Sequence, residues 1–305
     1  CRAASAGVDV VRVGVLPTPA IAFLVAETGA DLGVMISASH NPMPDNGIKL
    51  FSRGGGKLDD AIEAAIEKRM GEPWVRPTGR NVGRITFDDT AETRYANHLL
   101  ASVTTPLAGL KIVVDCANGA ASHVAPRTYE KAGATVIAIH HQPDGWNINE
   151  NCGSTHLEDL QARVIAEKAD FGIAHDGDAD RCLAVDAHGE IVDGDAIMTI
   201  LARGFKERGA LQANTIVTTV MSNLGFIKAM KDADIEVVTT AVGDRYVLEE
   251  MLKHDFSLGG EQSGHLIMRE FAGTGDGILT ALQLAQEVRR TGKSLADLAA
   301  AMQRS

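Results

Sequence analysis

The sequence predicts an α/β protein built from three consecutive α/β domains with mixed, mainly parallel sheets. Short runs rich in Val and Ile alternate with longer segments of helical periodicity, a pattern typical of parallel strands connected by flanking helices. The length of 305 residues allows two or three domains. Three strand-like runs, at 32–36, 112–115 and 215–220, each lead into a small-residue loop that contains an asparagine. We interpret this recurrence as one α/β unit used three times.

Helices are expected where apolar residues recur at helical spacing. Pro19 suits the first turn of a helix that continues to about Thr28, with Thr18 as its N-cap. Three further segments show the same spacing, at 58–70, 196–208 and 275–290.

Breaks in this pattern predict the domain limits. Proline residues interrupt it near 73–77, and a second break falls near 193–195. We therefore expect the first domain at residues 1–84, the second at 85–193 and the third at 194–305.

Charge and cysteine content exclude several classes of function. The 40 acidic and 29 basic residues give a net charge of −11, which argues against a nucleic-acid backbone as the main partner. The longest uncharged apolar stretch lies between Arg12 and Glu27 and carries two prolines, and it is shorter than the roughly 20 apolar residues that span a bilayer. The cysteines form no C-x-x-C pair, so we expect neither a zinc site nor a disulfide framework, and a reducing, cytoplasmic location. They are Cys1, Cys116, Cys152 and Cys182.

The most informative motif is a loop of three carboxylates between two apolar runs. Asp176, Asp178 and Asp180 alternate with small residues between the runs 171–174 and 182–185, which predicts a tight strand-to-strand connection. At about 5–6 Å and an effective dielectric constant near 20, each pair of charges repels by roughly 3 kcal/mol. Such crowding is tolerated in open water or around a cation, and hard oxygen ligands suit Mg²⁺. A solvated acidic turn and a magnesium site are therefore both open interpretations.

Two other interpretations fit this loop unequally. An EF-hand needs Gly at the sixth loop position and Glu at the twelfth. Counted from Asp176, those positions hold Arg181 and Ala187, so the EF-hand is excluded. An aspartyl-phosphate phosphatase uses an Asp at a strand end as nucleophile, with a second Asp two residues later. Asp176 and Asp178 fit this hypothesis, which stays open although Asp180 stands where a hydroxyl residue is typical.

A second motif places a serine in the loop after the first strand-like run. Ser39 has His40 beside it and Lys49 ten residues further on. An acyl-transfer elbow needs Gly-x-Ser-x-Gly, but Ala38 and His40 flank this serine. Phosphoryl transfer needs mainly positioning and charge neutralisation, which an imidazole and a lysine supply. The alternative is a capped turn in which Asn41-Pro42 ends the strand.

The third motif combines an acid, a hydroxyl and an imidazole before an apolar run. In an extended backbone, Glu261, Ser263 and His265 project to the same side. That set suits hydrogen bonding to neighbouring hydroxyls of a hexose, and the alternative is a polar edge strand. Upstream, the Gly-Asp-Arg sequence at 243–245 predicts a helix cap, with Arg245 directed either at a ligand or into solvent.

Taken together, the three loops resemble the α-D-phosphohexomutase superfamily, most closely its bacterial glucosamine branch. The motifs that carry the resemblance are 37–42, 176–181 and 260–265, in that order. Further stretches that resemble the glucosamine branch are 147–149, 152–155, 242–247 and 274–279. The resemblance covers essentially the whole chain, and three ordered motifs are far more specific than any one of them. It implies an active-site cleft between the domains.

The resemblance also implies roles for residues of all three loops. Ser39 would carry a phosphoryl group as phosphoserine. The implied ligands of one Mg²⁺ are an oxygen of that phosphate and the carboxylates of Asp176, Asp178 and Asp180. Arg181 would help neutralise the transferring group, with Lys49 or His40 assisting in proton handling or charge. The implied substrate-binding residues are Glu261, Ser263, His265, Asp244 and Arg245.

The activity implied by the resemblance is the interconversion of glucosamine 6-phosphate and glucosamine 1-phosphate. It would run through a hexosamine 1,6-bisphosphate that is both activator and intermediate, and would feed UDP-N-acetylglucosamine and cell-wall synthesis. The alternatives are a phosphomannomutase/phosphoglucomutase and, in a different class, a sugar-phosphate binding module without transfer chemistry. The expected partner is a small sugar phosphate, without nucleic acid or membrane, and a homodimer is left open.

The sequence also departs from the superfamily. Superfamily members resemble four-domain enzymes whose last domain carries a phosphate-binding loop rich in Arg, Ser, Gly and Thr. Nothing after residues 274–279 supplies such a loop, and the superfamily's N-terminal opening segment has no counterpart either. We therefore expect the metal and phosphoserine sites without the clamp for the non-reacting phosphate, and slow turnover by this chain.

Overall fold

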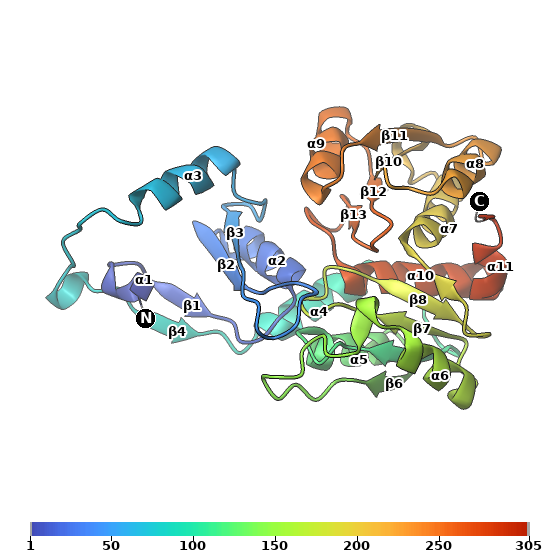
Figure 1. The fold of residues 1–305 in the computed structure, drawn as a ribbon, viewed down its shortest axis with the longest axis horizontal. Helices are drawn as coiled ribbons and strands as arrows, with labels where there is room; N and C mark the ends of the chain where they lie inside the picture. The colour runs from blue at the N-terminus through green and yellow to red at the C-terminus, as the bar shows by residue number, and fades with distance from the viewer. Residues whose placement is uncertain (1, 304–305) are drawn as a thin grey trace.

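A computed structural model describes residues 2–303, so Cys1 lies outside the described part of the chain. The predicted α/β class is confirmed. Within the described residues, strands alternate with helices (Figure 1). The strands form two larger mixed sheets and two separate strand pairs. The first segment of the chain extends to one side in Figure 1, and the two larger sheets lie on the other side with α10 between them. None of the helices described is both long and apolar enough to cross a bilayer.

The first segment carries the two strand pairs. In chain order its elements are α1 (Arg2–Ser5), β1 (Val10–Arg12), α2 (Thr18–Thr28), β2 (Leu32–Ile36), β3 (Ile48–Ser52), α3 (Asp60–Arg69), the 3-10 helix η1 (Gly79–Asn81) and β4 (Ile85–Phe87). β1 pairs in parallel with β4, which lies just after residue 84. β2 pairs antiparallel with β3, so residues 37–47 form the loop of a hairpin.

Helix α2 confirms the helix predicted from Pro19 to about Thr28, but it begins differently. Its N-cap is Pro17, which makes no side-chain capping bond. The prediction that Thr18 caps the helix is wrong, because Thr18 is its first residue and donates its hydroxyl to Asp178 Oδ2 at 2.5 Å. The side chain that could have capped α2 is therefore used to contact the second segment.

The second segment forms a five-stranded mixed sheet. Its elements are α4 (Ala91–Ala101), β5 (Lys111–Asp115), α5 (Ala121–Lys131), β6 (Thr135–Ile139), η2 (Gly153–Thr155), α6 (Glu158–Glu167), β7 (Phe171–Ala174), β8 (Leu183–Asp186) and β9 (Ile191–Val192). The strand order is β6-β5-β7-β8-β9, with the first three strands parallel and the last two antiparallel to their neighbours. Because successive strand residues alternate between faces, Ile112 and Val114 pack on the α5 side and Val113 packs on the α6 side. Helices on both faces therefore bury this sheet.

The third segment forms a four-stranded sheet. Its elements are α7 (Gly194–Glu207), η3 (Gln212–Asn214), β10 (Thr215–Thr219), α8 (Leu224–Asp232), β11 (Glu236–Thr240), α9 (Asp244–His254), β12 (Leu258–Gly260), β13 (Leu266–Met268), α10 (Gly277–Thr291) and α11 (Leu295–Ala299). The strand order is β11-β10-β12-β13, and only the last pair is antiparallel. Helices α3, α7 and α10 confirm the helices predicted at 58–70, 196–208 and 275–290.

The two larger sheets repeat one topology. In each, the second strand along the chain pairs with the first, the third pairs on the first strand's other side, and the fourth joins the third antiparallel. The runs at 112–115 and 215–220 are therefore equivalent first strands, as the predicted repeat requires. The run at 32–36 is not equivalent, because β2 forms an antiparallel hairpin with the next strand and so corresponds to β7 and β12. Each of the three predicted functional loops thus connects the two strands of such a hairpin.

Helix α10 lies at the centre of the structure. Figure 1 shows it running between the two larger sheets, and its residues are buried from Gly277 to Val288. It contacts α4, α5 and α7. One hydrophobic cluster extends from Leu24 of α2 through both sheets to Leu295 of α11. The three segments therefore share a core that supports their loops.

The N-cap of α10 gives the protein a pH-dependent contribution to stability. Asp276 is buried, and it accepts hydrogen bonds from the amide of Leu279 at 2.9 Å and from the hydroxyl of Tyr95 at 2.8 Å. Burial raises the pKa of Asp276 from 3.8 to about 6 despite these bonds. The pKa of Asp276 is higher in the folded than in the unfolded protein. The contribution of the protonated side chain to the free energy of unfolding is therefore full below pH 3.8 and is lost as the pH rises through about 6.

We expect Asp276→Asn to gain stability relative to the parent protein as the pH rises. Asparagine keeps the size and the capping oxygen of the side chain but carries no charge. The difference in unfolding free energy between variant and parent should increase by roughly 2.5 kcal/mol between about pH 4 and pH 7.5. Urea unfolding of both proteins at the two pH values measures this difference, and a difference that does not change with pH contradicts the prediction.

Candidate active site

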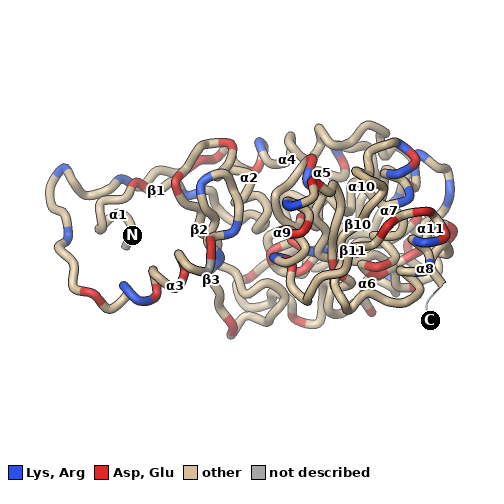
Figure 2. The backbone as a smooth tube through the Cα atoms, turned by 90° about the horizontal axis from the view of Figure 1, so that it is seen from above, with Lys and Arg blue, Asp and Glu red and all other residues tan. Residues whose placement is uncertain are grey.

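The three carboxylates of the second segment lie buried in the loop between β7 and β8. Asp176, Asp178 and Asp180 are each less than a tenth exposed, and carboxylate oxygens of all three lie within 4.8 Å of one another. The interpretation as a solvated acidic turn is wrong, because the protein encloses these carboxylates. Figure 2 shows charged residues dispersed along the whole backbone, so burial rather than charge density marks this cluster.

A buried imidazole holds the two ends of this loop together. His175 Nδ1 donates to the carbonyl of Arg181 at 3.0 Å, and the hydroxyl of Tyr129 lies 2.7 Å from His175 Nε2. Burial lowers the pKa of His175 to about 4, so the ring is neutral and its Nε2 accepts the hydrogen bond from Tyr129. The carboxylates therefore sit on a turn whose ends are joined through a buried side chain.

The serine loop between β2 and β3 reaches this cluster from the first segment. Ser39 Oγ donates to Asp176 Oδ2 at 3.2 Å, although the two residues are 137 positions apart. Ser39 adopts the left-handed conformation, with φ of 56°, and its amide donates to Ser37 Oγ at 2.9 Å. His40 Nδ1 lies 3.4 Å from Ser39 Oγ. Burial and then the charge of Arg181 lower the pKa of His40, and the serine hydroxyl lies between the Asp176 carboxyl group and the His40 imidazole.

Lys49 extends from β3 into the same cluster. Its Nζ lies 2.5 Å from Asp178 Oδ2 and 3.1 Å from Asp180 Oδ2. Burial opposes the charge of Lys49, but the carboxylates of Asp180 and Asp178 outweigh it and raise the pKa of the lysine. Because Thr18 also donates to Asp178 Oδ2, two side chains of the first segment hold this carboxylate.

Two oxygens of the cluster face no hydrogen-bond donor. Asp178 Oδ1 and Asp180 Oδ1 are buried and have no partner among residues 2–303. Burial, together with the carboxylates of Asp180 and Asp178, raises the pKa of Asp176. Buried anionic oxygens without donors are unfavourable, and hard oxygen ligands suit a divalent cation. The donor set of this acidic triad therefore fits a metal ion.

Arg181 lies at the end of the same loop. Its amide donates to Asp176 Oδ1 at 3.2 Å, and its Nε lies 3.9 Å from Asp176 Oδ2. Nε is buried and has no hydrogen-bond partner within the described part of the chain. The guanidinium thus brings positive charge and an unused donor to the cluster, a combination that suits anionic oxygens.

The loop between β12 and β13 differs from the sequence prediction. An extended backbone over Glu261, Ser263 and His265 is wrong, because these residues form the turn of a hairpin. The amide of Gly264, which has φ of 90°, donates to the carbonyl of Glu261 at 3.0 Å. The amide of Glu261 in turn donates to the carbonyl of His265 at 3.0 Å. The left-handed glycine reverses the chain, so Glu261 and His265 face each other while Ser263 lies in the turn.

His265 connects this third loop with the carboxylate cluster. Its Nε2 lies 3.5 Å from Asp244 Oδ2 and 3.9 Å from Asp180 Oδ2. Burial opposes ionisation of Asp244, but the charges of His265 and Lys57 outweigh it and lower its pKa. Lys57 belongs to the first segment and forms an ion pair with Asp244. All three segments therefore meet at one place.

The start of α9 borders the same region. Gly243 is the N-cap of α9, as the sequence predicts, and its amide donates to Glu261 Oε1 at 3.2 Å. Arg245 lies on α9, where its Nε is 2.8 Å from Glu249 Oε1. The structure therefore brings Glu261 and Asp244 to the site, whereas the guanidinium of Arg245 pairs along its own helix.

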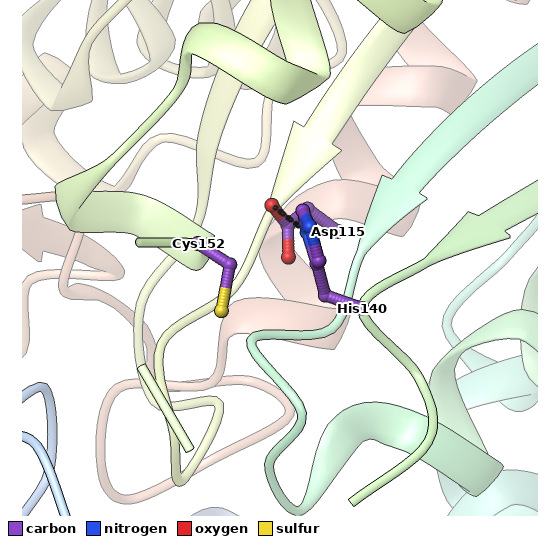
Figure 3. Close-up of side chains that lie close together, drawn as sticks. All are labelled: Asp115, His140 and Cys152. Carbon is purple, nitrogen blue, oxygen red and sulfur yellow. Dashed lines mark hydrogen bonds and ion pairs between the residues drawn. The ribbon is translucent and has the colours of Figure 1, made fainter. Parts of the chain in front are cut away.

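A second cluster lies at the same edge of the five-stranded sheet (Figure 3). Asp115 ends β5 and accepts hydrogen bonds from His140 Nδ1 at 3.0 Å and from the amide of Gly153 at 2.9 Å. The other ring nitrogen of His140 lies 3.2 Å from a carboxylate oxygen of Asp159. The bond to Asp115 raises the pKa of His140, and burial raises that of the Cys152 thiol to about 12. Because Asp115 and His140 bind each other, we interpret them as an ion pair that anchors the loop after β6.

Sequence reasoning missed three residues that support the site. Thr18 and Tyr129 make their contacts with residues far away in the chain, and no local pattern marks them. Asn149 belongs to the motif at 147–149, but its contacts with the serine loop have no sequence signature. The motif marked the position of Asn149 and gave no information about its partner.

Solved structures share this fold. A phosphoglucomutase/phosphomannomutase family protein from Burkholderia thailandensis is 26% identical with a TM-score of 0.83, over 98% of this chain and 66% of that one. A putative phosphomannomutase from Thermus thermophilus is 28% identical with a TM-score of 0.83, over 97% and 68%. The N-acetylphosphoglucosamine mutase of Aspergillus fumigatus, solved with GlcNAc-6P and magnesium, is 17% identical with a TM-score of 0.72, over 94% and 77%. This last similarity concerns the fold alone.

Family models match the three segments in order. They are the phosphoglucomutase/phosphomannomutase α/β/α domain I at residues 2–73, domain II at 93–189 and domain III at 193–305. The three domains and the loops that meet between them define the class of protein as an α-D-phosphohexomutase.

Bacterial relatives narrow this class. The phosphoglucosamine mutase of Cutibacterium acnes is 63% identical over 303 residues, which are 99% of this chain and 67% of the relative. That of Mycolicibacterium paratuberculosis is 60% identical over 299 residues, which are 98% and 67%. The chain thus spans about two thirds of the length of these relatives. It belongs to the phosphoglucosamine mutase family, a family of isomerases, and the resemblance predicted from its loops is confirmed.

Proposed function

We propose that this protein interconverts glucosamine 6-phosphate and glucosamine 1-phosphate in the cytoplasm, with Ser39 as the carrier of the phosphoryl group. The observation that carries the proposal is the 3.2 Å hydrogen bond between Ser39 Oγ and Asp176 Oδ2. It brings a hydroxyl of the first segment to a buried carboxylate cluster of the second. The family of the bacterial relatives supports the choice of glucosamine phosphate as the substrate.

The residues proposed to hold Mg²⁺ are Asp176, Asp178 and Asp180, together with an oxygen of the phosphate on Ser39. The two buried oxygens without donors, on Asp178 and Asp180, support this assignment. When bound, the cation would neutralise charge on the transferring phosphoryl group and align it. Lys49 contributes a second positive charge, since its Nζ already pairs with Asp178 and Asp180.

The transfer takes place in two halves. In the first, the bond between phosphorus and Ser39 Oγ breaks, a bond from phosphorus to a sugar hydroxyl oxygen forms, and the hydroxyl proton passes through a base to Ser39 Oγ. In the second, the sugar bisphosphate has turned over, its other phosphoryl group moves to Ser39 Oγ, and the serine proton passes through the base to the sugar oxygen that loses the phosphoryl group. The phosphoserine is thus regenerated and the net reaction is an isomerisation.

His40 is the residue we assign to proton handling. Its Nδ1 lies 3.4 Å from Ser39 Oγ. Lys49 is committed to two carboxylates and therefore acts as a fixed positive charge. Arg181, with a buried Nε that has no partner within residues 2–303, is proposed to bind the equatorial oxygens of the transferring group.

The sugar is proposed to bind between the second and third loops. Glu261, Ser263 and His265 offer an acceptor, a hydroxyl and an imidazole in one hairpin turn. Asp244 is 3.5 Å from the His265 ring and contributes a further carboxylate. Arg245 would take part only by leaving its contact with Glu249.

Intact-mass measurement tests the carrier role of Ser39. Incubation with Mg²⁺ and a hexosamine 1,6-bisphosphate should add about 80 Da to the protein, the mass of one phosphoryl group. Ser39→Ala should abolish this addition, whereas Ser37→Ala, in the same loop, should keep it. Phosphate that persists in Ser39→Ala would exclude Ser39 as its site. If Ser39→Ala kept the addition and Asp176→Asn abolished it, the phosphate would lie on the aspartate, as in an aspartyl-phosphate phosphatase.

Substrate comparison separates the remaining alternatives. The phosphorylated protein should transfer its phosphate to glucosamine 1-phosphate faster than to glucose 1-phosphate or mannose 1-phosphate. A preference for glucose or mannose would point to a phosphoglucomutase/phosphomannomutase. Binding of sugar phosphate without any transfer would indicate a module without catalytic chemistry.

A further inference from the structure

Asn149 joins the second segment to the serine loop. It lies between β6 and η2, is 6% exposed, and adopts the left-handed conformation with φ of 56°. Its Nδ2 donates to the carbonyl of Ser39 at 2.9 Å and to the carbonyl of Asn41 at 2.8 Å. Both hydrogens of one buried carboxamide therefore bind the main chain on either side of His40.

These contacts hold a loop that has little other support. Within residues 2–303, they are the only hydrogen bonds that another segment makes to the main chain of residues 38–46. The other main-chain bonds of the loop are internal, such as the one from Asn41 to the carbonyl of Ala38 at 3.1 Å. Ser39 itself adopts a left-handed conformation, which non-glycine residues keep only when surrounding contacts enforce it.

Asn149 is itself held firmly. Its amide donates to the carbonyl of Ala117 at 2.9 Å. The loop that carries it is anchored by the ion pair of His140 with Asp115, which also binds the amide of Gly153 (Figure 3). The position of Asn149 is therefore determined by the five-stranded sheet.

The serine loop, Asn149 and the carboxylate loop pack against one another at Gly177. A Cβ atom added to Gly177 would lie 2.6 Å from Asn149 Nδ2 and 2.6 Å from the carbonyl oxygen of Ser39. Gly177 lies between Asp176 and Asp178 in the carboxylate loop. The carboxamide thus orients the serine main chain at the point where the two loops touch.

We propose that Asn149 is a positioning residue for phosphoryl transfer at Ser39. By binding the carbonyls of Ser39 and Asn41, it fixes the peptide planes around the serine and so aims Ser39 Oγ at Asp176. The inference rests on the proposed carrier role of Ser39. It adds that the second domain, besides supplying carboxylates, sets the direction of the serine hydroxyl in the first.

Two variants of Asn149 separate its carboxamide from its backbone conformation. Asn149→Gly keeps access to the left-handed conformation and removes both donors. Asn149→Asp keeps the size of the side chain but places an oxygen against two carbonyl oxygens. Asn151→Gly is the matched control, because Asn151 is exposed, has φ of 52° and makes no hydrogen bond to the serine loop in the described structure.

The readout is single-turnover transfer of phosphate from the phosphorylated protein to glucosamine 1-phosphate, followed by intact mass at several sugar concentrations. For Asn149→Gly we expect the rate constant to fall by about 10²-fold, the effect of misplacing a reacting group by about 1 Å. The half-saturating sugar concentration should stay within about 3-fold of the parent value, because Asn149 makes no hydrogen bond to residues 261–265 in the described part of the chain. The rate constant of Asn149→Asp should be lower still, and that of Asn151→Gly should equal the parent value.

The outcomes distinguish the inference from the proposed function. A parent protein that never carries phosphate on Ser39 overturns both. A phosphorylated Asn149→Gly that transfers at the parent rate overturns the positioning role alone. The positioning role is also overturned if Asn149→Gly lowers the rate constant and the thermal stability and raises the half-saturating sugar concentration by a similar factor. That result would indicate a residue with a merely structural role.

Discussion

Asp178→Asn is expected to lower phosphoryl transfer by on the order of 10³-fold and to weaken Mg²⁺ binding by at least about 10-fold. Asp178 is 1% exposed, and its two oxygens have different surroundings. Oδ2 accepts from Lys49 and Thr18, whereas Oδ1 faces no donor among the described residues. An asparagine has one oxygen and one amino group. It can satisfy either the donors or the cation, but not both.

The measurement combines calorimetric titration of Mg²⁺ with the single-turnover transfer assay. Titration reports on the metal site independently of catalysis. Asp31→Asn is the control, since Asp31 is an exposed carboxylate that pairs with Arg53, and it should change neither quantity. Parent-like Mg²⁺ affinity in Asp178→Asn would remove Asp178 from the metal site even if transfer were slow.

Much of the fold could be predicted because its signals are local. Strands and helices differ in the spacing of apolar residues, so segments such as 275–290 were identified from periodicity alone. The three functional loops were also identified, because each contains a dense group of chemically active residues between two apolar runs. Their shared position in the fold was not evident, since it depends on which strands pair.

The errors have a common cause. Thr18 looked like a cap because local sequence favours a hydroxyl at the start of a helix, but its hydroxyl binds Asp178, 160 positions away. The alternation of polar residues at 261–265 predicts an extended backbone. The left-handed conformation of Gly264 depends instead on the pairing of β12 with β13, which the local sequence does not specify. Local rules fail where a distant contact determines the conformation.

Each of the three dissimilar loops of the site connects the two strands of an antiparallel hairpin. In both larger sheets, the functional loop connects the third strand to the antiparallel fourth strand, and in the first segment the serine loop likewise connects the antiparallel strands β2 and β3. One architecture therefore presents a hydroxyl, an acidic and a polar loop. The loops can differ in chemistry because the antiparallel strands, not the loop residues, set their positions.

Lys49→Met is expected to destabilise the metal-free protein and to slow transfer. The ammonium group of Lys49 binds both Asp178 Oδ2 and Asp180 Oδ2, and the lysine side chain is 27% exposed. Removing one partner leaves buried charges uncompensated, which costs about 3–5 kcal/mol when the pair is fully buried. With a discount for the exposure of Lys49, we expect a loss of about 2 kcal/mol in unfolding free energy. Transfer should fall by about 10²-fold if Lys49 has the proposed role of a positive charge beside the phosphoryl group.

The decisive comparison for Lys49→Met is between its stability and transfer rate with and without Mg²⁺. Lys49 binds the Oδ2 atoms of Asp178 and Asp180, whereas their Oδ1 atoms have no donor among the described residues, so Asp178 and Asp180 would hold Mg²⁺ without displacing Lys49. Mg²⁺ should therefore restore much of the lost stability but little of the lost rate. Arg53→Met, which removes an exposed partner of Asp31, should alter neither. If Lys49→Met were as stable as the parent without Mg²⁺, the lysine would not be the charge that compensates Asp178 and Asp180.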